Sequence, residues 1–223
     1  MSAGRGLFVT GTDTGVGKTG VATALLRAHV AAGRRAVGMK PVAAGIDDGA
    51  RVNADVAALA AAGNVDAPLS DRNPYAFAPA VAPHVAAAAA GVVIDADAIE
   101  AAYARLAARA DVVIVEAAGG VCVPLGPRLD MLDVAARLRL PVLLVVGVRL
   151  GCLNHALLTE QALRLRGVRL AGWVANVIEA DMPAEDENIV TLSRRLPAPC
   201  LAVVGYGGTP QFAGPWLGDG EPC

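Results

Sequence analysis

Gly11-Thr12-Asp13-Thr14-Gly15-Val16-Gly17-Lys18-Thr19 is a glycine-rich stretch between an apolar run, Leu7 to Thr10, and a helical pattern that begins at Thr19. It follows the pattern G-x-x-x-x-G-K-T with one further residue between Gly11 and Gly17, and in this pattern the glycines let backbone N–H groups turn inward around a phosphate. Lys18 can then reach the outer phosphates, the Thr19 hydroxyl can bind Mg²⁺, and the N-terminus of the helix faces the same anion. The alternative is a tight strand-to-helix turn with a solvated Lys18. The strand and helix on either side favour a phosphate-binding loop.

The composition predicts one domain over residues 1–223. A chain of this length suits one domain, and no linker or low-complexity segment divides it. Hydrophobic residues make up 55% of the chain but aromatic residues only 4%, so Ala, Val and Leu must build the core. Such a core suits helices packed closely on a buried parallel sheet.

Charge and hydropathy argue against several kinds of partner. The formal net charge is −2 with mixed signs, and no block of Lys and Arg is present, so we expect no nucleic-acid partner. Residues 1–6 are too short and polar for a signal peptide, and no apolar run approaches the ~20 residues that span a bilayer. We therefore expect a cytoplasmic protein without a membrane partner. The four cysteines, which lie far apart, indicate neither a disulfide framework nor a zinc site: Cys122, Cys152, Cys200 and Cys223.

Lysine is rare in this chain. Of the 19 Lys and Arg residues, only Lys18 and Lys40 are lysines. A compact ammonium can point at a single phosphate oxygen, whereas a guanidinium would crowd a tight loop. The two retained lysines therefore suggest two positions that require the smaller head, although chance remains an alternative for Lys40 alone.

Hydrophobic periodicity predicts alternating strands and helices. The expected strands are 7–10, 36–40, 111–116, 142–146 and 170–177, and the expected helices are 19–32, 55–62, 94–109, 132–139, 153–165 and 185–196. Segments 41–53 and 68–83 are expected to be irregular, with a turn at Asn73-Pro74-Tyr75, and a tail rich in Gly and Pro follows the last helix. This order predicts an α/β, P-loop NTPase-like parallel sheet with helices on both faces.

A carboxylate follows the apolar strand at 111–116. Glu116 comes after Val112-Val113-Ile114-Val115 and precedes Ala117-Ala118-Gly119-Gly120. An acid at the carboxyl end of such a strand can hold Mg²⁺ directly or through water, and the small residues let N–H groups approach an anion. The alternative is a strand-end charge that faces water.

Several motifs, taken in order, resemble the dethiobiotin synthetases. The resemblance covers Phe8 to Pro199 and rests on the combination more than on any one motif. Besides the phosphate loop, the motifs are Lys40-Pro41-Val42, Asn73-Pro74-Tyr75, Pro83-His84, Val115-Glu116 with Ala118-Gly119-Gly120, residues 147–155, and Gly172-Trp173-Val174-Ala175-Asn176.

The resemblance implies an ATP- and Mg²⁺-dependent enzyme of biotin biosynthesis that joins 7,8-diaminononanoate and CO₂ into dethiobiotin. An amine takes up CO₂, the carbamate attacks the γ-phosphate, and the second amine closes the ring. The resemblance also implies a homodimer with the substrate at the interface.

Roles for particular residues follow from the resemblance. Catalytic roles fall to Lys40, Lys18 and Thr14, and metal ligation to Thr19, Asp55 and Glu116. The nucleotide would contact Gly15, Val16, Gly17, Lys18, Thr19, Gly20, Asp55, Glu116, Ala117, Ala118, Gly119, Asn176 and Val177. The substrate would contact Lys40, Ala44, Gly119, Gly120, Leu150, Gly151 and Asn154. Asp55 could instead be only a helix N-terminal acid, and His84 and His155 are expected to be structural.

Some positions depart from the family pattern. Gly15, Ala44, Ala117 and Asn188 stand where relatives often carry Glu, Ser, Gly and Tyr. Residues 201–208 lack the family's Gly-Glu-Ile-Pro-Trp-Leu stretch, so the preference for ATP is implied by the resemblance alone.

Two other functional classes share the phosphate loop. One is an amide synthase of the cobyrinate diamide synthase type, whose added glutaminase domain has no room in this chain. The other is a partition or septum-placement ATPase, whose loop usually carries a further lysine where Thr12 and Asp13 stand here. Lys40-Pro41-Val42 favours the small-molecule enzyme.

Overall fold

The computed structural model describes residues 6–47 and 49–218, and the structural statements below concern those residues. Its main sheet has six strands in the order β2 (Ala36–Met39), β5 (Val112–Glu116), β1 (Gly6–Gly11), β6 (Val142–Val148), β7 (Leu170–Val177) and β8 (Cys200–Val204). All neighbouring strands run parallel, as predicted. The carboxyl ends of all six strands therefore meet at one edge, where open α/β sheets bind ligands.

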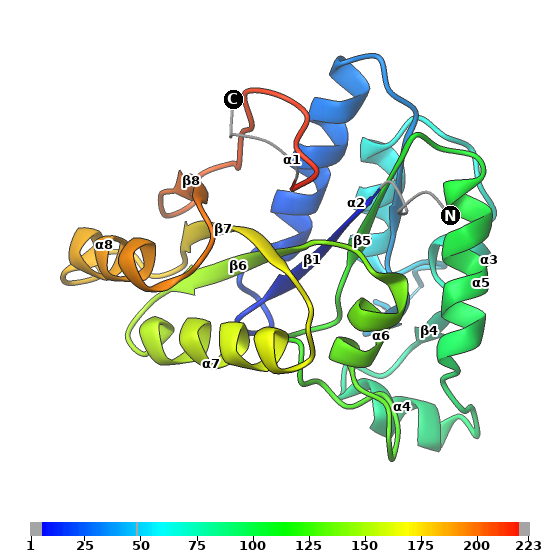
Figure 1. Ribbon diagram of the computed structural model, residues 1–223. Helices are drawn as coiled ribbons and strands as arrows, with labels where there is room; N and C mark the ends of the chain where they lie inside the picture. Colours follow the sequence, from blue (N-terminus) through cyan, green and yellow to red (C-terminus); the bar gives the residue numbers. More distant parts are fainter. Residues whose placement is uncertain (1–5, 48, 219–223) are drawn as a thin grey trace.

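Helices cover both faces of this sheet, which confirms the predicted architecture (Figure 1). On one face, Leu7 and Val9 of β1 share a core with α1 (Lys18–Ala31) and α2 (Ala54–Ala62). On the other face, Phe8 packs in a core with α5 (Ala96–Ala107) and α6 (Met131–Leu138). The same face continues over β6 and β7 to α7 (Cys152–Leu165) and α8 (Glu185–Arg195). Successive residues of a strand point to opposite faces, so a strand covered on both sides reads as a continuous apolar run.

The prediction of irregular structure at 41–53 and 68–83 was wrong in part. A second, two-stranded parallel sheet pairs β3 (Val42–Ala44) with β4 (Tyr75–Phe77), and the short helices α3 (Leu69–Arg72) and α4 (Pro83–Ala89) flank it. Strands of three residues have no readable periodicity, and their hydrogen bonds join segments about thirty residues apart.

The sequence analysis placed only a tail rich in Gly and Pro after the last helix and missed β8, which extends the sheet beside β7. Beyond β8 the chain returns to α1. The His29 Nε2 atom lies 3.3 Å from the Trp216 carbonyl oxygen, and both side chains are buried. The tail thus closes the core over α1.

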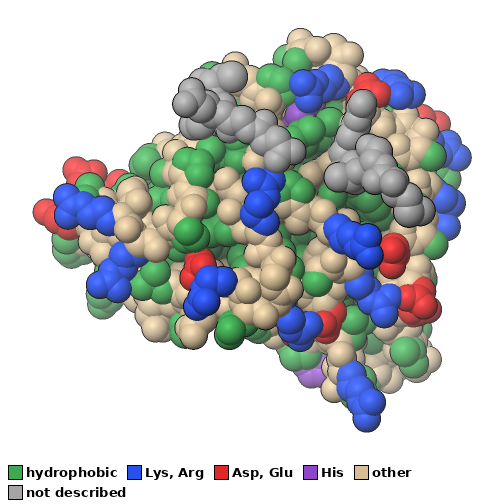
Figure 2. Space-filling view, viewed as in Figure 1, with side chains coloured by type: hydrophobic (Ala, Val, Ile, Leu, Met, Phe, Trp, Pro, Cys, Tyr) green, Lys and Arg blue, Asp and Glu red, His purple; other side chains and the backbone are tan. Residues whose placement is uncertain are grey.

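Charged side chains are dispersed over the face seen in Figure 2, where Lys and Arg do not gather into one patch. Within residues 6–47 and 49–218, no helix combines the length and the apolar character that a membrane crossing requires. Cys223 lies outside the described residues.

Candidate active site

A pocket of about 700 Å³ lies where the phosphate loop meets the ends of β2 and β5. It brings together many of the residues singled out in the sequence: Thr14, Gly15, Gly17, Lys18, Thr19, Lys40, Ala44, Asp55, Glu116, Ala118 and Gly119. The segment Ala80–Pro83, which sequence reasoning did not connect with the site, also lines the pocket. The pocket therefore collects residues from four distant parts of the chain.

The phosphate loop is held in place by the strand next to it and the one beyond. Gly17 has φ +91°, and a Cβ there would lie 2.3 Å from Asn176 Nδ2. That amide donates a hydrogen bond to the Val16 carbonyl oxygen at 2.9 Å, while the Gly147 N–H donates to Thr12 Oγ1 at 3.2 Å. Only glycine fits position 17, because both the backbone angle and the space exclude a side chain.

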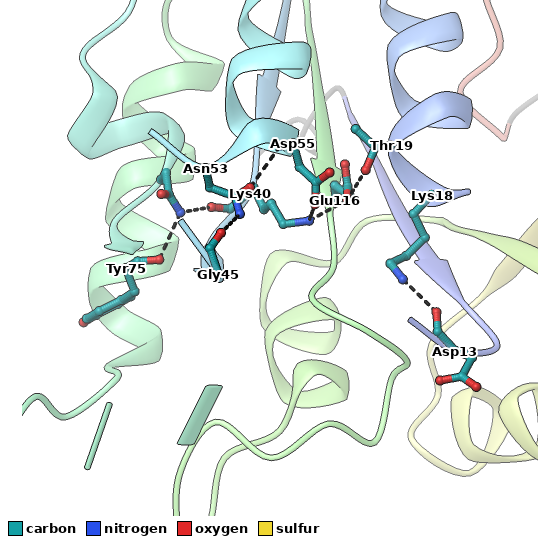
Figure 3. A network of polar contacts seen from close by, with 10 residues as sticks. Asp13, Lys18, Thr19, Lys40, Gly45, Asn53, Asp55, Tyr75 and Glu116 are labelled. Atoms are coloured by element: carbon teal, nitrogen blue, oxygen red, sulfur yellow. Dashed lines mark hydrogen bonds and ion pairs between the residues drawn. The ribbon is translucent and has the colours of Figure 1, made fainter. Parts of the chain in front are cut away.

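Lys18 does not point toward the other site residues in this structure. Its Nζ donates a hydrogen bond to the carbonyl oxygen of Asp13 at 2.8 Å, within the loop itself (Figure 3). The side chain is only 6% exposed. Burial lowers the pKa of Lys18 to about 8, against the opposing pull of Glu116.

Lys40 joins the two carboxylates of the site. It follows β2, which pairs with β5, so its side chain and Glu116 lie at adjacent strand ends. Its Nζ lies 2.6 Å from Glu116 Oε1 and 2.6 Å from Asp55 Oδ2 (Figure 3). This is a buried ammonium between two acids.

The protonation of this cluster follows from burial and pairing. Burial opposes the charge of Lys40, but Glu116 and Asp55 outweigh it and raise the pKa of the ammonium. Burial also raises the pKa of Glu116, with Lys40 pulling in the other direction. For the more exposed Asp55, burial is outweighed by Lys40 and the pKa falls. The lysine therefore stays cationic at neutral pH.

The same acids offer oxygen ligands to a cation. The Thr19 hydroxyl donates to Glu116 Oε1 at 2.9 Å, and the buried Glu116 Oε2 has no hydrogen-bond partner among the described residues. A hydroxyl and two carboxylates are hard oxygen donors, which suit Mg²⁺. No group of three His, Cys, Asp or Glu side chains suited to a metal occurs in the described residues.

Other predicted residues do not line this pocket. Val16, Ala117 and Val177 are buried in the core. Asn176 lies behind the phosphate loop, Gly20 faces Pro210, and Gly120 lies against Gly11. Leu150, Gly151 and Asn154 lie at the junction of β6 and α7, where the Leu150 side chain is 92% exposed. Within this chain they are separate from the pocket.

Asn53 lies outside the pocket lining but supports the site, and sequence reasoning missed it. It caps α2, since its Oδ1 accepts the Asp55 N–H at 3.0 Å, and its Nδ2 donates to the Gly45 carbonyl oxygen at 2.6 Å. It therefore orients the turn that carries Asp55. An Asn just before an apolar helix is a known start signal and could have identified it.

Comparison with known proteins identifies close relatives. A family described as AAA domain matches residues 5–208. An ATP-dependent dethiobiotin synthetase BioD from Nitrosospira multiformis is 52% identical over 92% of this chain and 90% of its own length. A protein of the same name from Aromatoleum aromaticum is 54% identical over 92% of both chains, and one from Cellvibrio japonicus is 50% identical over 90% of this chain and 89% of its own.

Solved structures show the same fold at low identity. MinD in a MinC:MinD complex from Aquifex aeolicus has a TM-score of 0.59 at 15% identity, covering 90% of this chain and 81% of its own. MinD from Pyrococcus horikoshii has a TM-score of 0.54 at 17% identity with the same coverage. At this identity the likeness concerns the fold alone, whereas the close sequence relatives bear one name. The chain belongs to the ATP-dependent dethiobiotin synthetase family.

Proposed function

We propose that this protein forms dethiobiotin from 7,8-diaminononanoate, CO₂ and ATP, releasing ADP and phosphate, as a carbon–nitrogen ligase of biotin biosynthesis. The observation that carries the proposal is the 50–54% identity to relatives of that name over at least 90% of this chain. The pocket agrees with it, since one wall is a phosphate loop and the other carries a buried ammonium between two acids.

The reaction has three balanced steps. One substrate amine adds to CO₂, forming a carbamate and releasing a proton. A carbamate oxygen then bonds to the γ-phosphorus of ATP as the bond from that phosphorus to ADP breaks. Finally the second amine attacks the carbamate carbon, phosphate leaves with its oxygen, and a second proton is lost as the ring closes. Each step needs positioning and charge stabilisation more than covalent help from the protein.

Lys40 and Lys18 are proposed to stabilise the charge that develops in this transfer. Lys40 stands at the pocket with its charge secured by Glu116 and Asp55. Lys18 would turn from the Asp13 carbonyl to the outer phosphates when nucleotide binds, because an anion is a stronger partner than a neutral carbonyl. Thr14 and Gly119 line the same pocket and would contact the carbamate and the substrate.

Thr19, Asp55 and Glu116 would hold Mg²⁺. The support is their oxygen donors, together with the unpartnered Glu116 Oε2. When bound, the ion would neutralise part of the phosphate charge. Glu116 stands at the end of β5 and Asp55 in the first turn of α2, with the Lys40 ammonium between them.

The substrate site is proposed to be completed by a second copy of the chain. Leu150, Gly151 and Asn154 lie outside the pocket of their own chain, and Leu150 is almost fully exposed. A homodimer would bring such residues to the partner's pocket.

We also take residues 1–223 to act as one domain and place the enzyme in the cytoplasm, where ATP and metabolic intermediates are available.

Product analysis tests the proposed function. The purified protein is incubated with 7,8-diaminononanoate, ATP, Mg²⁺ and ¹³C-bicarbonate, and the products are examined by mass spectrometry. We expect dethiobiotin with one ¹³C atom in the ureido carbonyl. Unlabelled product or none would contradict the proposal, and an amide formed only with glutamine would favour the amide synthase.

A further inference from the structure

The motif Asn73-Pro74-Tyr75 contains a buried amide with two partners. Asn73 is 7% exposed, and its Nδ2 donates to the Lys40 carbonyl oxygen at 2.7 Å and to the Tyr75 carbonyl oxygen at 3.0 Å. One NH₂ group has two hydrogens, so both of its donors are used. The side chain thus ties the end of β2 to the start of β4.

The peptide groups of Lys40 are held on both sides by the same short segment. The Lys40 N–H donates to the Arg72 carbonyl oxygen at 2.8 Å, and the Asn73 amide binds the Lys40 carbonyl. One residue on, the Tyr75 N–H donates to the Pro41 carbonyl oxygen at 3.2 Å. Lys40 is therefore the point at which the chain leaves the main sheet and enters the second sheet.

Tyr75, at the start of β4, is in turn bound to the start of α5. The Tyr75 hydroxyl accepts a hydrogen bond at 2.9 Å from the N–H of Asp95, the residue that caps α5. Hydrogen bonds thus link Asp95 to Tyr75, Tyr75 to Asn73, Asn73 to Lys40 and Lys40 to Glu116, and Figure 3 shows the last of these.

We propose that Asn73 is a positioning residue that fixes the backbone of Lys40, and so sets where its ammonium stands in the pocket. The inference rests on the proposed function for its effect on catalysis, although its structural part does not. Asn73 is not part of the pocket lining and acts only through Lys40.

A lysine needs such a support because its stem is flexible. The ammonium is held by Glu116 and Asp55, the same carboxylates that would turn to Mg²⁺. Once they do, the backbone of Lys40 decides how far the ammonium reaches. Without Asn73 the buried Lys40 carbonyl lacks its donor, and the peptide can rotate to find another. Small errors in the placement of catalytic groups are costly to the rate.

Asn64, an exposed residue that follows α2, offers a control because its side-chain amide binds the backbone at the other end of β2. Its Oδ1 accepts the Ala36 N–H at 2.8 Å and its Nδ2 donates to the Arg34 carbonyl oxygen at 3.0 Å. It is thus an amide clamp at the opposite end of β2, remote from the pocket. We expect Asn73→Ala to lower kcat by ~10-fold or more, with the KM for ATP within ~2-fold of wild type. Asn64→Ala should retain the wild-type kcat.

The two lysines provide a readout that does not depend on catalysis. The protein is treated with acetic anhydride without nucleotide or metal, and peptide mapping follows the acetylation of Lys18 and Lys40 separately. In wild type the Lys40 amine is shielded by burial and two carboxylates. Asn73→Ala should speed Lys40 acetylation by ~3-fold or more and leave Lys18 unchanged, because only the Lys40 backbone is released. Asn64→Ala should alter neither rate.

The outcomes separate the two claims. A wild-type kcat and a wild-type Lys40 acetylation rate in Asn73→Ala would overturn the inference, as would equal effects in Asn64→Ala. If wild type makes no dethiobiotin, the proposed function fails, and the acetylation contrast alone decides the role of Asn73. Should Asn73→Ala not fold, Asn73→Ser, whose single hydroxyl can donate to at most one of the two carbonyls, takes its place with the same expected results.

Discussion

Lys40 shows how one residue can serve both the fold and the chemistry. Its ammonium neutralises the fully buried Glu116, which would otherwise carry a desolvated charge. Its position after β2 also places it at the pocket beside Asp55. A substitution of Lys40 therefore changes both the unfolding free energy and kcat, and the two changes can be measured independently.

Lys40→Met should keep most nucleotide binding while kcat falls by at least ~100-fold, because the lost cation stabilises charge that develops during transfer. The variant should also lose roughly 3 kcal/mol of unfolding free energy, since Glu116 loses its buried partner. Calorimetric titration with ATP, at a temperature where the variant is folded, measures nucleotide binding, so that a loss of kcat is not mistaken for a loss of folded protein. A variant that binds ATP normally and turns over at the wild-type rate would remove Lys40 from the mechanism.

The lowered pKa of Lys18 predicts that the stability of the nucleotide-free protein depends on pH. Its pKa falls from 10.5 to about 8 on folding because the ammonium is buried. Below pH 8 both states are charged and the folded state bears the full cost of desolvation. Between about 8 and 10.5 the unfolded state binds more protons, so this group makes stability rise with pH, by roughly 3 kcal/mol in total.

Chemical denaturation of wild type and Lys18→Met between pH 7 and 10 measures this contribution. This contribution makes the wild type less stable than Lys18→Met at pH 7, because only the wild type buries a charged ammonium. The difference in unfolding free energy should narrow as pH rises and Lys18 loses its proton. A difference that is constant with pH would mean that Lys18 has an ordinary pKa. The sequence predicted that Lys18 belongs to the loop but could not predict its bond to Asp13, which depends on the folded loop geometry.

Among the secondary structure elements, those with a clear period could be predicted. β7 was predicted at Leu170–Val177 as observed, because eight mostly apolar residues stand between charged and glycine-rich turns. β3 and β4 were missed, since neither three-residue strand has a pattern without the other. β8 was missed because Leu-Ala-Val-Val before a glycine-rich stretch resembles a tail until β7 supplies its hydrogen bonds. The order of the strands in the sheet could not be predicted either, because it depends on which distant segments pair.

The cap of α2 matters for the site as well as for the helix. Asn53→Ala should cost ~1 kcal/mol in unfolding free energy through loss of the cap, and should also reduce kcat because Asp55 loses its orientation. Asp95→Ala removes the equivalent cap of α5, where the Asp95 carboxylate accepts the Asp97 N–H at 2.9 Å on the surface. Urea denaturation and steady-state kinetics on both variants test this. Equal kcat values in the two would show that Asn53 is only a cap.

At the scale of the whole molecule, the proposed homodimer predicts a particular interface. Leu158 and Leu165 of α7 are exposed and lie seven residues apart, so they share a face of the helix. Leu158→Glu should shift the sedimentation coefficient from dimer toward monomer, because burying a carboxylate in an interface is unfavourable. Val93→Glu, at another exposed apolar residue, should not. A wild-type protein that sediments as a monomer and is fully active when dilute would contradict the dimer.

The central claim is that a carbamate, formed in this pocket, attacks ATP. The most direct measurement is ADP release with 7,8-diaminononanoate and Mg²⁺ present, first with CO₂ and bicarbonate removed and then with them restored. The account predicts almost no ADP in the first condition and full release in the second, because the carbamate is the nucleophile that takes the γ-phosphoryl group and it cannot form without CO₂. Equal ADP release with and without CO₂ would contradict it.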